Sequence, residues 1–291
     1  MGRIGRGWQL TKKSWSVVRA DGSLLGFAVI AAVSGVLCAA VFFGAGAGLV
    51  LATTADWLAV PVALVGLYVL VTIGIFCNVA LACCATRALD GERTTVGQGL
   101  AAAGSRLGLI LKWAAVQLVV GTVISLIQSA LRQGAGQVMG LIVGGLANFA
   151  WMVATFFVVP GIAFEGLGPK QALKRSTELI WARWGEGLTG TTAIGLVAFL
   201  VGFLPGALLI GIGIGMAQQS AGAGAVTISI GVLLMALTML LQTTITTVFK
   251  VALFRFATQG AVLGPFDRAE LEHAFSSAPG GLRNPPGRKR S

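Results

Sequence analysis

Side chains that could carry out catalysis or bind a metal are nearly absent from the apolar parts of this sequence. The only histidine is His273, near the C-terminal end. Five long runs contain no Asp, Glu, Lys or Arg: residues 22–55, 57–86, 113–131, 133–164 and 187–249. These runs therefore cannot hold a serine–histidine dyad, a pair of catalytic aspartates or a histidine-rich metal site. We expect no enzymatic activity, no cofactor and no bound metal.

The four cysteines are the remaining candidates for chemistry, and they fall within the apolar runs: Cys38, Cys77, Cys83 and Cys84. Because none lies in an outer loop, no exported disulfide is expected. The adjacent pair Cys83-Cys84 could serve as a lipidation or redox site. Free cysteine usually packs as a small apolar residue, and this is the interpretation that we favour.

A few amide side chains interrupt the apolar runs, and two interpretations of them are open. Asn78, Asn148 and Gln242 could form hydrogen bonds between helices, or they could line a polar cleft or pore. We favour the first, because polar side chains inside a membrane commonly join helices. Ion-coupled transport is disfavoured, because such transporters carry ionisable residues along their path.

The composition places these residues in membrane-spanning helices. Of 291 residues, 56% are apolar and only 11% are charged, and the mean hydropathy is +0.87. A soluble domain carries about 25% charged residues, so much of this surface must face lipid. Because about 20 apolar residues cross a bilayer as a helix, the runs accommodate six spans. They are expected near residues 24–51, 58–82, 109–131, 138–159, 188–211 and 226–249, with the fourth ending at Pro160.

The net charge of +11 is distributed in a way that predicts membrane orientation rather than nucleic-acid binding. Every Lys and Arg except Arg132 falls before the first span, between the second and third, between the fourth and fifth, or after the sixth. Basic residues accumulate on the cytoplasmic side of membrane proteins. We therefore expect a multi-pass protein of the plasma (inner) membrane with both termini in the cytoplasm, and no nucleic-acid partner.

Two segments that precede spans are predicted to be amphipathic helices at the membrane surface: residues 1–20 and the segment that follows Pro169. The anionic inner leaflet attracts the basic residues of such helices. We expect a cytoplasmic collar that contacts anionic lipid or an acidic partner of unknown identity. Its residues would be Lys12, Lys13, Trp15, Lys174, Arg175, Trp181 and Trp184. A simpler alternative is that the basic residues only set the topology.

The inner turns resemble one another, which predicts an internal repeat. Residues 9–14 (QLTKKS) resemble residues 171–176 (QALKRS), and residues 88–91 (ALDG) resemble residues 163–166 (AFEG). Thr95 and Gln98 fit a capping box at the start of a middle copy, although its match is short enough to be coincidental. A unit with two spans returns to its starting side, so its copies would be parallel.

The predicted fold is therefore all-α, with six transmembrane helices in three units of one interfacial helix and one hairpin. A single domain would cover residues 1–275. Residues 276–291 are rich in proline, glycine and basic residues, and are expected to form a disordered cytoplasmic tail.

Three segments carry a resemblance to a known group of proteins: residues 7–15 (GWQLTKKSW), residues 172–176 (ALKRS) and residues 252–257 (ALFRFA). Together they resemble an uncharacterised family of bacterial and archaeal six-helix membrane proteins, a domain of unknown function. They are also distantly similar to the membrane domain of glycerophosphodiester phosphodiesterases. The resemblance implies six spans and no known activity.

These observations favour a non-enzymatic scaffold or accessory protein that binds lipid or a partner at its basic cytoplasmic face. The alternative is a transporter or channel for an uncharged or lipid-like solute. A cavity lined by Asn148 that reaches the middle of the membrane would favour transport, and a filled bundle centre would favour the scaffold.

Overall fold

The computed structural model of the chain describes residues 12–19, 21–52, 57, 59–134, 136–183, 198–218, 220–262, 264 and 266. These residues form helices and the turns between them, with no strand among them. The predicted tail at 276–291, the end of the predicted domain at residue 275, Trp184 and the first half of the fifth span lie outside the described residues.

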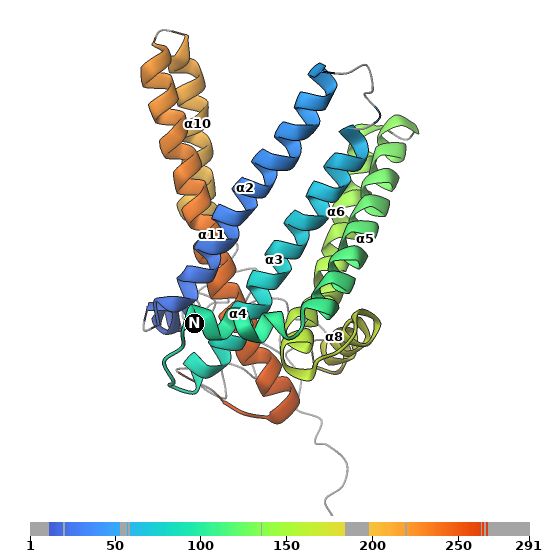
Figure 1. Cartoon of the computed structure of the whole chain (residues 1–291), viewed down its shortest axis with the longest axis vertical. Coiled ribbons are helices and arrows are strands. Elements are labelled where there is room, and N and C mark those ends of the chain that lie inside the picture. Colours follow the sequence, from blue (N-terminus) through green and yellow to red (C-terminus); the bar gives the residue numbers. More distant parts are fainter. Residues whose placement is uncertain are drawn as a thin grey trace, which may run out of the picture.

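Six helices in the described part are long and apolar enough to cross a membrane. They are α2 (Ser23–Ala52), α3 (Ala59–Leu89), α5 (Leu107–Gly134), α6 (Gln137–Ala154) continued by α7 (Val158–Pro160) and η2 (Gly161–Glu165), η3 (Phe199–Phe203) continued by α10 (Leu204–Ala217), and α11 (Ala221–Gln259). Two shorter helices, α4 (Val96–Gly104) and α8 (Pro169–Arg183), lie together with the helical residues 12–19 at one end of the molecule (Figure 1). The expectation of an all-helical membrane protein is confirmed.

Glycines allow the two helices of each hairpin to approach closely. In the α10–α11 hairpin, a Cβ added at Gly231 would lie 2.7 Å from the carbonyl oxygen of Gly206. A Cβ at Gly144 of α6 would lie 2.6 Å from the side chain of Gln128 on α5, and one at Gly66 of α3 would lie 2.5 Å from a side chain of α2. Small residues at such contacts are how membrane helices bring their backbones together.

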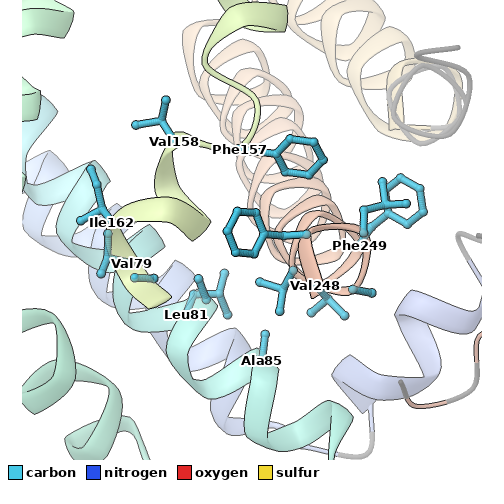
Figure 2. Packing of buried hydrophobic residues seen from close by; sticks show 14 of the residues in the cluster. Val79, Leu81, Ala85, Phe157, Val158, Ile162, Val248 and Phe249 are labelled. Atoms are coloured by element: carbon cyan, nitrogen blue, oxygen red, sulfur yellow. The ribbon is translucent and has the colours of Figure 1, made fainter. Parts of the chain in front are cut away.

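The largest group of buried side chains lies where α4 and α8 cross the ends of the spanning helices. We call this end the base and the opposite ends of the hairpins the tips. Figure 2 shows the centre of the base, where side chains from α3, from the segment around α7 and from α11 pack together: Val79, Leu81, Ala85, Phe157, Val158, Ile162, Val248 and Phe249. Leu24 and Phe27 of α2 and Ile110 and Trp113 of α5 extend the same cluster. The base is therefore where the three hairpins are joined.

The fourth span does not end at Pro160, and this prediction is wrong. The helix breaks earlier, at residues 155–157, and a new helical segment runs through Pro160 to Glu165. Proline is tolerated there because Pro160 lies in the first turn of the new segment, where backbone N–H groups have no partner within the helix. The break frees the N–H of Phe157, which donates to the buried hydroxyl of Ser176 at 3.0 Å.

One other local prediction is confirmed, and the sixth span is longer than expected. Thr95 caps α4 in a capping box, with its side chain accepting from the N–H of Gln98 and the Gln98 side chain accepting from the N–H of Thr95. The sixth span continues beyond Lys250 and ends at Gln259, where Gly260 takes the left-handed conformation (φ 68°) that glycine adopts without steric cost.

Candidate functional site

Helix α8 presents one face to the core and one to the surroundings. Ala172, Ser176 and Leu179 are buried against the base, whereas Lys174 is exposed and Trp181 leaves 83% of its surface uncovered. A tryptophan exposed to this extent on an otherwise packed helix is typical of the level where membrane meets water. The structure thus places Lys174 and Trp181 on the same outward surface.

Two basic residues of α8, Lys174 and Arg175, have carboxylate partners on or near their own helix. Lys174 lies 3.8 Å from Glu178, one turn along, and both side chains are largely exposed. Arg175 lies 3.3 Å from Glu165, at the end of η2. Exposed ion pairs of this kind contribute about 0–1 kcal/mol, so the pairing of Lys174 leaves its charge open to a stronger external anion.

The helical residues 12–19 repeat this division of faces. Ser14, Val17 and Val18 are buried, Lys12 and Trp15 are exposed, and Lys13 is half-buried. Ser14 corresponds to Ser176 in the sequence repeat and is likewise fully buried, but its hydroxyl has no hydrogen-bond partner. Both surface helices therefore combine a buried serine with an exposed basic and aromatic face.

The two surface helices do not meet. Figure 1 shows the N-terminal helical residues and α8 on opposite flanks of the base. The predicted collar residues are therefore spread around the base and do not converge on one pocket.

The three amide residues have separate environments. Asn78 of α3 accepts from the hydroxyl of Thr247 of α11 at 3.2 Å, which joins two hairpins. Asn148 is exposed and donates to the carbonyl of Gly144 in its own helix at 2.8 Å. Gln242 is half-buried on α11, and within the described residues no hydrogen bond joins it to Asn78 or Asn148.

A polar cluster at the start of α2 was not among the sequence-predicted sites. Asp21 accepts from the N–H of Ser23 at 3.1 Å, and from the N–H and hydroxyl of Thr94 at 3.2 and 2.7 Å. Partial burial alone would raise the pKa of Asp21, but the hydrogen bonds from Ser23 and Thr94 outweigh it and lower the pKa below its usual value. Asp21 caps α2 and holds the segment before α4 against it. The short Asp-Gly-Ser sequence ahead of an apolar run was the available signal for the cap, and nothing in the sequence indicated Thr94.

Metal binding finds no geometric support in the part of the chain that the structure describes, where no three His, Cys, Asp or Glu side chains gather. Cys77 and Cys84 are buried and Cys83 is half-buried. The thiol of Cys84 points to the carbonyl of Thr95 at 3.7 Å and that of Cys83 to the carbonyl of Ala163 at 4.0 Å. The adjacent cysteines thus point to different neighbours.

Comparison with known proteins assigns a family. The chain belongs to a family of unknown function (DUF6159), whose model matches residues 57–264. Neither the curated proteins nor the solved structures contain a match. The expected membership of an uncharacterised family is therefore confirmed, and the distant likeness to glycerophosphodiester phosphodiesterases receives no support.

Proposed function

We propose that this member of a family of unknown function is a non-enzymatic scaffold or accessory protein, which binds anionic lipid or an acidic partner at its base. The observation that carries the proposal is the outward surface of α8. There Trp181 is 83% exposed beside the exposed Lys174, while the other face of the helix is buried in the core. An aromatic ring and an ammonium group on one surface suit the anionic headgroup region.

The proposal requires the base to face the cytoplasm, with the protein in the plasma membrane. The distribution of basic residues supports this orientation, because all of them except Arg132 belong to segments next to the base or to the termini. Each basic residue close to an anionic leaflet adds about 1 kcal/mol of attraction.

The same proposal includes three units, each made of a surface helix and a hairpin. Three observations support it. The helical residues 12–19, α4 and α8 each precede a spanning segment at the base. The last spans of the units all end in a left-handed glycine: Gly91, Gly166 and Gly260. Ser14 and Ser176, equivalent in the repeat, are both fully buried.

A transporter or channel for an uncharged or lipid-like solute is the second candidate. It would need polar groups along a path through the membrane. Asn78 is already engaged by Thr247, and Asn148 bonds to its own backbone. These contacts favour a structural use of the amides and therefore the scaffold.

The experiment is to measure the anionic phospholipid that co-purifies with the protein in mild detergent, by mass spectrometry, for the double variant Lys174→Glu with Trp181→Ala. The control reverses the tail residues Arg288, Lys289 and Arg290, a larger change in charge away from α8. We expect the α8 variant to retain clearly less lipid than the tail variant. Equal retention by the wild type and the α8 variant, with both folded, would show that these residues serve only to set topology.

A further inference from the structure

Helix α11 is enclosed on nearly all sides where it passes through the base, but one stripe of it remains open. Val248, Phe249, Val251 and Leu253 are each at most 1% exposed. Among these buried residues Lys250 is half-buried, and the half-buried Thr246 and Thr243 lie one and two turns closer to the tips. The exposed stripe of α11 therefore ends, at the base, with Lys250.

The stripe is long enough to run along one leaflet. A helix turns about 100° per residue, which places Met239, Thr243, Thr246 and Lys250 within one narrow face of α11, with Gln242 at its edge. The stripe rises about 1.5 Å per residue, so Met239 lies about 16 Å from Lys250. That length is roughly half of the hydrocarbon core of a bilayer. Met239 itself is 63% exposed.

Three polar side chains of this stripe lack partners among the described residues, whereas Thr243 donates to the carbonyl of Met239 at 2.8 Å. Thr244 donates to the carbonyl of Leu240, and Thr247 donates to Asn78. Within the described part of the chain, Gln242, Thr246 and Lys250 make no hydrogen bond or ion pair.

Within the described residues, the Lys250 ammonium interacts with an aromatic ring. Its Nζ lies 4.7 Å from the centre of the Phe156 ring, at the break between α6 and α7. A cation–π contact compensates only part of the cost of removing an ammonium group from water. No carboxylate of the described residues pairs with this ammonium group. A cation in an apolar wall is suited to an anionic ligand.

We propose that this stripe binds one anionic phospholipid of the leaflet next to the base. The phosphate lies on Lys250, and the hydroxyl of Thr246 and the amide of Gln242 face the ester oxygens deeper in the leaflet. The acyl chains lie along the exposed apolar surface around Met239. A phosphate group could also come from a free soluble anion. We assign the lipid because the stripe continues from Lys250 into an apolar surface that only acyl chains would cover. This site is separate from the surface of α8 and does not depend on it.

The test is a lipid titration of the delipidated full-length protein by native mass spectrometry, with phosphatidylglycerol and with phosphatidylcholine. The main variant is Lys250→Met, which keeps the length of the side chain. The matched control is Lys112→Met, which removes an exposed lysine from α5 near the base. We expect phosphatidylglycerol to bind about tenfold more weakly to Lys250→Met, since one charge-assisted contact is lost. Lys112→Met should bind it as the wild type does.

A second measurement separates a binding role from a structural one. If Lys250 serves to bind a ligand and does not stabilise the fold, the Lys250→Met variant should unfold at the same or a higher temperature without lipid. The reason is that an unpaired ammonium group is replaced by an apolar group. Lys250→Arg should keep most of the phosphatidylglycerol affinity. Should the Met variant fail to fold, Thr246→Val is the substitute, with weaker phosphatidylglycerol binding expected.

Two results would overturn the proposal. One is phosphatidylglycerol affinity in Lys250→Met, or in its substitute Thr246→Val, equal to that of the wild type. The other is displacement of phosphatidylglycerol by inorganic phosphate at millimolar concentration, which would assign the site to a soluble anion. Adding Lys250→Met to the Lys174→Glu variant should weaken phosphatidylglycerol binding as much as it does in the wild type, so failure of the α8 proposal and failure of this one are distinguishable.

Discussion

The base and the tips of this protein hold their helices together in different ways. At the base, bulky side chains from all three hairpins pack together, and Trp113, Phe157 and Phe249 are each only 1% exposed. Toward the tips, the α10–α11 hairpin diverges from α2 and α3 (Figure 1), and close contacts are made within hairpins, at glycines such as Gly206 and Gly231. Lipid tails are as apolar as the side chains that they cover, so exposed apolar tips need no tertiary partner in a membrane.

The largest expected effect follows from this contrast. Phe249 is 1% exposed in the base and Leu233 is 60% exposed nearer the tip of the same helix. Phe249→Ala should lower the free energy of unfolding by about 3–5 kcal/mol, because a cavity opens among fixed neighbours. Leu233→Ala should change it by less than about 0.5 kcal/mol. Unfolding curves in detergent would measure both, and similar losses at the two positions would contradict the division into base and tips.

A smaller effect is expected where backbones touch within a hairpin. Gly231→Ala places a Cβ 2.7 Å from the carbonyl oxygen of Gly206 and should cost about 1–3 kcal/mol by overpacking. Gly211→Ala on the facing helix is the control, because a Cβ there meets nothing within 4 Å. The comparison uses the same unfolding assay. A loss at Gly211 as large as that at Gly231 would show that close packing does not decide the result, because alanine has the higher helix propensity at both positions.

The smallest effect concerns Asp21 and pH. Its folded pKa is lowered by hydrogen bonds from Ser23 and Thr94, so the stabilisation that it provides is fully present above its unfolded pKa of about 3.9. That stabilisation is lost as the pH falls through the lower, folded pKa. The Asp21→Asn variant should therefore have a lower free energy of unfolding than the wild type at pH 7, and this difference should shrink below about pH 4. A difference that does not change with pH would mean that the carboxylate charge contributes nothing to stability.

The sequence predicted what depends on composition and local chemistry. The six apolar spans and the Thr95–Gln98 capping box required no knowledge of tertiary packing. Pro160 was misinterpreted because it lies in the first turn of a new helical segment, which follows a break in the helix. The N–H of Phe157 at this break finds its partner in Ser176, which belongs to another helix. Lys250 was counted only as one of many orientation signals. Its isolation became visible once the neighbouring residues of α11 were seen to be buried.

The candidate site was predictable in part for the same reason. The sequence predicted an amphipathic helix after Pro169, and the structure places Lys174 and Trp181 on the outward surface of that helix. The sequence could not reveal that the two surface helices lie on opposite flanks of the base, or that Asn148 bonds to its own helix while Asn78 joins two hairpins. Such distinctions arise from contacts between residues far apart in the chain.

The proposed function depends on the base facing the cytoplasm, and labelling of single cysteines tests this most directly. In a variant whose four native cysteines are replaced by alanine, one cysteine is placed at Ser105, at the end of α4 in the base, or at Ser220, in the turn between α10 and α11. With a maleimide that cannot cross membranes, we expect Ser220→Cys to be labelled in intact cells and Ser105→Cys only after lysis. Labelling of Ser105→Cys in intact cells would place the base outside and contradict the account.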